Sequence, residues 1–182
     1  MWYVCGLRGV AALLAAVLVL TRPSWYSVFG VYLLADGLLC CASMLFAVGS
    51  GRLAFLVGAA SSLIAGALAL YSPMQRLKLE PMLLAAWAVI LGLTTLGAGI
   101  SLLPPDRQVL WCPLIGAGLV ALMVAVLLLV PEVQRLVETR AILGLFAATF
   151  GYLQLRASFS LGVAGAAVAR EPSDLLPSTR TR

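Results

Sequence analysis

Apolar residues fill six long stretches of this chain, and short polar connections separate them. A bilayer hydrocarbon core about 30 Å thick needs about 20 apolar residues per helix, because a helix of that length satisfies its backbone amides internally. The pattern therefore predicts an all-α polytopic membrane protein with six transmembrane helices. The predicted helices span residues 4–22, 28–48, 53–71, 82–103, 109–130 and 141–162.

Little of the chain lies outside these six spans, so we expect one membrane domain over residues 1–169. The remaining segment, 170–182, reads REPSDLLPSTRTR, and its Pro, Ser and Arg content predicts a disordered polar tail. The first apolar run continues into TRPSWY without a small-x-small cleavage site, so we interpret it as a retained helix and not as a signal peptide. These lengths leave no room for a soluble catalytic domain.

A Leu-x-x-Pro motif recurs at the end of the first, third and fifth spans. The three copies are LTRP (Leu20–Pro23), LYSP (Leu70–Pro73) and LLVP (Leu128–Pro131). Proline lacks an amide hydrogen and disfavours helical backbone in the residue before it, so each copy is expected to end a helix. The recurrence predicts three repeated helical hairpins, over residues 4–48, 53–103 and 109–162.

The second helix of each predicted hairpin carries an aromatic residue five positions before a glycine. The pairs are Tyr32 and Gly37, Trp87 and Gly92, and Phe146 and Gly151. In the third span, Gly58, Ser62 and Gly66 form a small-xxx-small ladder of the kind that lets membrane helices approach closely. A comparable ladder in the fifth span is Ala117, Ala121 and Ala125, so we expect the hairpins to pack through their first helices. The predicted helix-packing residues are Gly9, Gly37, Gly58, Ser62, Gly66, Gly92 and Gly151.

One aspartate, Asp36, interrupts an apolar run that carries no other charge from Val28 to Val48. A charge at mid-membrane costs roughly 2.5 to 3.5 kcal/mol on insertion scales, so it usually faces the bundle interior and finds a partner. Arg8 is the candidate partner, because counting from the hairpin turn puts the two residues within about 7 Å in depth, which the arginine stem can cover. We therefore predict an intramembrane charge pair between Arg8 and Asp36 that sets how the first two helices pack.

Two other roles for Asp36 stay open. Because burial disfavours the ionised carboxylate, Asp36 would change charge in an acid-stressed periplasm and respond to pH. Alternatively, its side chain meets only backbone groups or water. Replacement by asparagine separates these roles, since a response to pH requires a group that titrates.

The segments LRGVAALLAAVLVLTRPSW and YLLADGLL together resemble the HdeD-like family of small bacterial inner-membrane proteins. The matching residues are Arg8, Gly9, Pro23, Tyr32, Asp36 and Gly37. The resemblance extends weakly through the repeats over nearly the whole chain, and it implies six membrane helices and a role in acid resistance. Leu91 and Phe150 stand where the second and third hairpins would carry the aspartate, so the charge pair occurs once.

Composition narrows the classes of function. The chain is 63% hydrophobic and 10% charged, with a mean hydropathy of +1.07, far above a soluble domain. It has no histidine, and its four cysteines form no C-x-x-C pair, so we expect no metal site, no cofactor and no enzymatic activity. The net charge of +5 comes from scattered basic residues, which does not indicate nucleic-acid binding. The expected partner is the lipid bilayer, and a homo-oligomer or a membrane partner protein stays open.

Two polar residues, Gln154 and Arg156, lie in the inner half of the sixth span. On one interpretation, both residues line a polar path through the protein. On the other, they mark the end of the helix at the membrane surface, where the arginine side chain reaches the lipid headgroups. Our first hypothesis is a non-enzymatic inner-membrane protein that contributes to acid or envelope stress resistance. The alternatives are a small transporter or proton-conducting protein that uses Asp36, and a scaffold that acts through a partner.

An even number of helices puts both termini on one side of the membrane. The predicted spans assign seven basic residues to that side and five to the other. Arg180 and Arg182 lie too far from the last helix to influence orientation in the membrane, so the distribution of basic residues favours neither orientation strongly. We expect a multi-pass protein of the inner membrane with cytoplasmic termini.

Overall fold

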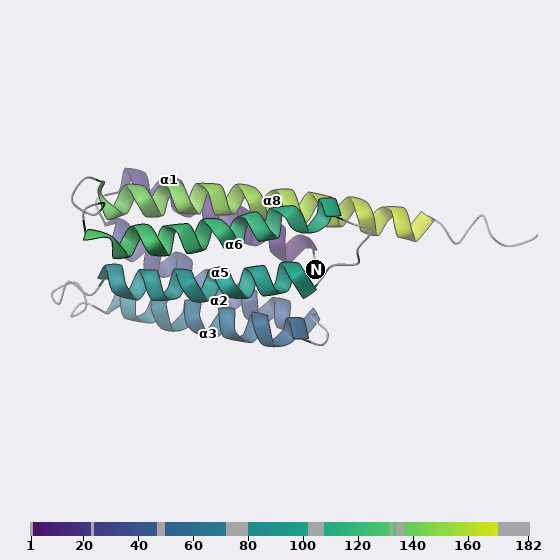
Figure 1. The fold of residues 1–182 in the computed structure, drawn as a ribbon, viewed down its shortest axis with the longest axis horizontal. Helices are drawn as coiled ribbons and strands as arrows, with labels where there is room; N and C mark the ends of the chain where they lie inside the picture. The colour runs from purple at the N-terminus through teal and green to yellow at the C-terminus, as the bar shows by residue number, and fades with distance from the viewer. Residues whose placement is uncertain are drawn as a thin grey trace, which may run out of the picture.

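The computed structural model describes residues 2–22, 24–46, 50–71, 80–101, 108–131, 133 and 137–170. Its elements in that part of the chain are long α-helices that lie side by side (Figure 1). They are α1 (Trp2–Thr21), α2 (Trp25–Phe46), α3 (Ser50–Leu70), α5 (Glu80–Ser101), α6 (Gln108–Leu129) and α8 (Thr139–Arg170). Five of the six are long and apolar enough to cross a membrane, and α5 has a shorter apolar stretch, Pro81–Gly97. The protein is therefore an all-α polytopic membrane protein.

The observed helix boundaries follow the hydropathy pattern closely. Every predicted boundary lies within three residues of the observed one, except the last. α1, α3 and α6 end two or three residues before Pro23, Pro73 and Pro131, as expected of a residue that disfavours helix before it. α8 continues to Arg170, eight residues past its predicted end, and its C-terminal turns extend beyond the other helices (Figure 1). The rest of the predicted tail, 171–182, lies outside the described residues.

The six helices form a closed ring in which each packs against two neighbours. The order around the ring is α1, α2, α3, α5, α6 and α8, and α8 packs against α1. The most extensive interfaces are α1 with α8, α2 with α3, and α5 with α6. The first helix of each predicted hairpin therefore packs most extensively on the second helix of the neighbouring hairpin, not on another first helix.

Glycines let the backbones touch at these extensive interfaces. A Cβ added to Gly151 of α8 would lie 2.8 Å from the carbonyl oxygen of Gly9 in α1. In the same way, a Cβ on Gly92 of α5 would lie 3.0 Å from the carbonyl oxygen of Gly118 in α6. Neither position has room for a side chain, so both glycines permit an approach that alanine would block.

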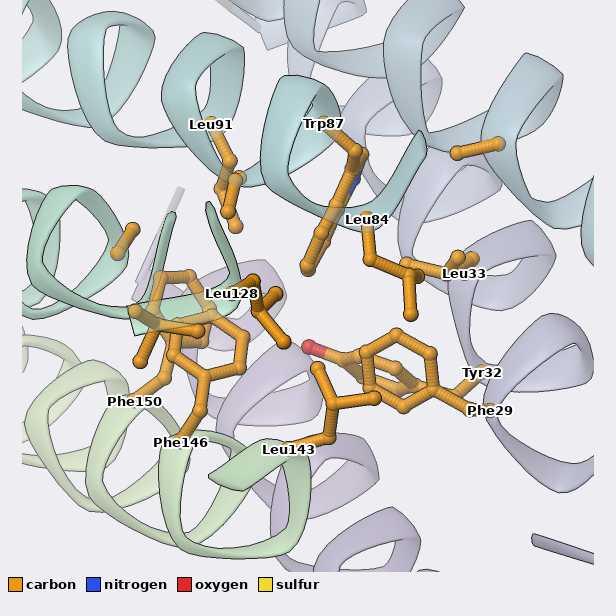
Figure 2. Close-up of a cluster of buried hydrophobic side chains, with 14 of the residues drawn as sticks. Phe29, Tyr32, Leu33, Leu84, Trp87, Leu91, Leu128, Leu143, Phe146 and Phe150 are labelled. Carbon is orange, nitrogen blue, oxygen red and sulfur yellow. The ribbon is translucent and has the colours of Figure 1, made fainter. Parts of the chain in front are cut away.

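The core contains the aromatic residue that recurs in each second helix. Tyr32, Trp87 and Phe146 are all buried and, with Phe29, Phe150 and several leucines, they converge from α2, α5, α6 and α8 (Figure 2). The rings of Trp87 and Phe146 meet edge to face, with centroids 5.8 Å apart. Because edge-to-face pairs add to the stability that burial gives, these contacts hold the centre of the ring together.

The outward faces of the helices are apolar. Exposed large hydrophobic side chains occur on all six helices, and examples are Leu14, Leu45, Ile64, Leu93, Met123 and Leu145. A soluble domain would not expose so many large apolar side chains, whereas hydrocarbon chains solvate them favourably. The surface is therefore suited to a lipid bilayer, and the polar side chains that carry chemistry lie inside.

Candidate functional site

A hydrogen-bonded polar network lies inside the bundle, and Asp36 is its centre. The Asp36 side chain, near the middle of α2, is almost inaccessible, with the residue 1% exposed. Its Oδ1 accepts a hydrogen bond from Arg8 Nε of α1 at 2.8 Å. Its Oδ2 accepts one from the Ser62 hydroxyl of α3 at 3.0 Å, and the Cys40 thiol lies 4.0 Å from the same oxygen. One carboxylate thus joins three helices.

The network continues through Ser62 to a fourth helix. Trp87 Nε1 of α5 donates to the Ser62 Oγ at 3.0 Å. The indole nitrogen can only donate, so the serine oxygen accepts from Trp87 and the serine hydrogen is directed to Asp36. The direction of every bond in this relay is therefore fixed as long as Asp36 is ionised. A charged acceptor strengthens such bonds relative to neutral pairs.

Arg8 has a second buried contact besides the ion pair. Its guanidinium carbon lies 5.9 Å from the centre of the Phe150 ring of α8, in the range of a cation–π interaction. The residue is 7% exposed, and its Nη2 atom has no hydrogen-bond partner. Arg8 thus connects α8 to the charge at the centre, while part of its hydrogen-bonding capacity stays unused.

Two further polar side chains in the core have unused hydrogen-bonding groups. Gln154 of α8 is 1% exposed, and neither its amide nitrogen nor its amide oxygen has a partner. The Tyr32 hydroxyl is also buried without a partner. Tyr32 lies one helical turn before Asp36, and Gln154 lies one turn after Phe150, which Arg8 contacts. Unpaired polar groups therefore lie one turn from Asp36 on α2 and one turn from the Arg8–Phe150 contact on α8.

The structure brings together some of the predicted site residues and separates others. Arg8 and Asp36 meet in the core, as the charge pattern predicts. Gln154 faces the interior whereas Arg156 is exposed, so these two do not line one path. Ser62, expected as a packing residue, is a hydrogen-bond partner of Asp36. Gly58 has ordinary contacts only, 3.7 Å from a built Cβ to the Thr94 hydroxyl.

The other predicted packing glycines lie at tight contacts. Gly37 faces Leu63, whose Cγ would lie 2.7 Å from an added Cβ, and Gly66 faces Leu34 at 2.9 Å. Gly9, Gly92 and Gly151 lie at the backbone crossings described above. A close approach is thus observed at five of the six predicted glycines.

Sequence reasoning missed the partners that surround the pair. The sequence pattern indicated Trp87 only as a recurring aromatic residue, and nothing in it predicted that the indole N–H would donate a hydrogen bond. Cys40 resembled a small apolar residue, although its position one turn after Asp36 placed it on the same helix face. Phe150 occupies the position of the aspartate in the third repeat, and this correspondence was the available sign that it would lie near the centre.

The chemical groups of this network are one buried carboxylate, one guanidinium and neutral hydrogen-bond donors. Among the residues that the structure describes, no group of three His, Cys, Asp or Glu side chains is close enough to hold a metal ion. Comparison with models of known protein families, with curated proteins and with solved structures finds no match. The arguments about function therefore depend on the residues themselves.

Proposed function

We propose that this chain is a non-enzymatic, multi-pass protein of the bacterial inner membrane that contributes to acid tolerance, with Asp36 as the group that responds to acid. The resemblance of the first hairpin to the HdeD-like family supports the cellular role and the location, and the proposal includes cytoplasmic termini. The observation that carries the proposal is the bonding of one buried carboxylate to Arg8 and Ser62.

A proton on Asp36 would change the contacts of several helices together. It would remove the charge that Arg8 faces and weaken the bond that Ser62 donates to the carboxylate. α1 and α2 share one of the less extensive interfaces of the ring, and the ion pair bridges it. Loss of the pair leaves a buried guanidinium uncompensated, which is strongly unfavourable and favours a rearrangement of α1 against α2.

Survival of bacterial cells in acid tests this proposal. Cells that produce the wild-type chain should survive acid challenge better than cells without it, and Asp36→Asn should remove the advantage because asparagine does not titrate. Ser43→Ala is a matched control, since Ser43 is buried on the same helix and bonds only to the Leu39 carbonyl. Equal protection by wild type and Asp36→Asn, at equal protein levels, would exclude Asp36 as the responsive group.

A second candidate function is proton conduction through the bundle. The unpartnered side-chain atoms of Gln154 and the unpartnered Tyr32 hydroxyl favour it, because buried polar groups on the helices that the ion pair contacts provide successive positions for a proton. Liposomes that contain the purified protein should then show a proton flux that Asp36→Asn abolishes. Absence of a flux above that of protein-free liposomes would leave acid tolerance without conduction.

A further inference from the structure

We propose that Arg8, Gln154 and Tyr32 form an internal site for a small monovalent anion of the halide class, which is filled when Asp36 is protonated. This inference rests on the proposed protonation of Asp36 and adds to it a ligand and a site. It does not depend on whether the protein conducts protons or protects cells.

Arg8 and Gln154 come to one level of the bundle from α1 and α8, and Tyr32 lies one turn from that level on α2. On α1, Gly6 packs next to the Ser158 side chain and Gly9 packs next to Leu155, so Arg8 lies at the depth of Gln154 on α8. The guanidinium over Phe150 directs Arg8 to the same face of α8. Tyr32 lies on α2, one helical turn before Asp36. The unused groups therefore lie at the level of the guanidinium on α8 and one turn away from it on α2.

The unused groups are mostly hydrogen-bond donors. Arg8 Nη2 and Gln154 Nε2 each carry two N–H groups, and Tyr32 carries one O–H. Both carboxylate oxygens of Asp36 already accept bonds from Arg8, Ser62 and Cys40. A ligand that accepts hydrogen bonds fits such a site, whereas a metal cation or an ammonium group would meet donors and a positive charge.

Charge decides when an anion can enter. The side chains that contact Asp36 are Arg8 of α1, Cys40 of α2 and Ser62 of α3. Trp87 of α5 bonds to Ser62, Phe150 of α8 lies under Arg8, and Tyr32 lies one turn before Asp36 on α2. Of these, arginine alone is charged at acidic and neutral pH. With Asp36 ionised the centre is neutral, and an anion would bring an uncompensated charge into the core. With Asp36 protonated, the anion takes its place opposite Arg8.

Thermal unfolding of the purified protein in detergent tests the site. Chloride at about 100 mM, exchanged for gluconate at constant ionic strength, should raise the midpoint by about 4 °C at about pH 4.5 and leave it unchanged at about pH 7.5. Asp36→Asn, which is neutral at every pH, should gain the chloride effect at both pH values. Gln154→Leu should lose most of it, and the control Ser43→Ala should keep it.

Three results would overturn the site. They are a chloride effect of equal size at both pH values in wild type, an undiminished effect in Gln154→Leu, and no effect in wild type at acidic pH. If Asp36→Asn does not fold, the chloride effect on wild type at the two pH values and on Gln154→Leu still tests the anion site. If the chloride effect is absent but acid survival still depends on Asp36, the anion site is rejected and the proposed function is kept. If chloride binds as expected but the chain does not improve acid survival, the proposed function is rejected and the anion site is kept.

Discussion

At the scale of single residues, Ser62 is the side chain that links α5 to the buried carboxylate. Its oxygen accepts from Trp87 and its hydrogen goes to Asp36, so both capacities of one hydroxyl are used inside the bundle. Its neighbour Ser61 bonds only to the carbonyl of Gly58 in its own helix. Two adjacent serines thus have the same chemistry and different roles, because a helix turns about 100° from one residue to the next.

Ser62→Ala should lower the unfolding midpoint, because it leaves the Trp87 N–H without its acceptor and removes a bond from Asp36. Unsatisfied buried groups cost roughly 1 to 3 kcal/mol each, so we expect a decrease of several degrees. Ser61→Ala is the matched control and should change the midpoint by about a degree or less, since local serine bonds within a helix add little stability. Thermal unfolding followed by tryptophan fluorescence measures both, and equal shifts would contradict the assigned role.

The charged members of the site could be predicted from the sequence, and the neutral ones could not. Arg8 and Asp36 stand out because an ionised group in an apolar span is rare and expensive. Serine and tryptophan are common in membrane helices, so neither residue type signals a hydrogen bond. Their roles depend on which faces of α3 and α5 point to α2, and this follows only from the packing of the helices.

At the scale of helices, the repeated glycines mark the interfaces between hairpins. Gly37, Gly92 and Gly151 each face a leucine of the next helix around the ring, namely Leu63, Leu122 and Leu13. The last of these contacts joins α8 back to α1. Helix positions could be predicted from hydropathy, but the end of α8 could not, because Ala, Gly and Val continue a helix beyond the apolar span that the bilayer requires.

Gly151→Ala should destabilise the bundle, since the new methyl group would lie 2.8 Å from the Gly9 carbonyl and force α1 and α8 apart. Overpacking of this kind costs typically about 1 to 3 kcal/mol. Gly97→Ala is the matched control, because a Cβ built on the helical Gly97 would have no atom of another helix within 4 Å among the described residues. We expect Gly97→Ala to be neutral or slightly stabilising in the same unfolding assay. A larger loss for Gly97→Ala than for Gly151→Ala would contradict the close crossing.

At the scale of the whole molecule, the ring closes because the first and last helices pack together. The α1–α8 interface is among the most extensive, although these helices are furthest apart in the chain. The Leu-x-x-Pro repeat indicates three equivalent units, but it leaves open whether they form a row or a ring. Hydropathy cannot decide this, since lipid and protein are equally apolar surroundings for a helix. Ring closure depends on Gly9 and Gly151, which permit the close approach.

A cross-link between Gly6→Cys and Ser158→Cys tests this closure directly. A Cβ on Gly6 would lie 3.6 Å from the Ser158 Cβ, within the range of about 3.5 to 4.5 Å that a disulfide spans. The native cysteines are first replaced by alanine, and the double variant is oxidised mildly in membranes. The two introduced cysteines should then form a disulfide, which protects most of their thiols from maleimide labelling. Gly6→Cys with Phe159→Cys is the control, because Phe159 is exposed and so faces away from α1. The thiols of this variant should remain free and react with maleimide. Full labelling of both pairs would mean that α1 and α8 do not meet and that the three hairpins form an open row.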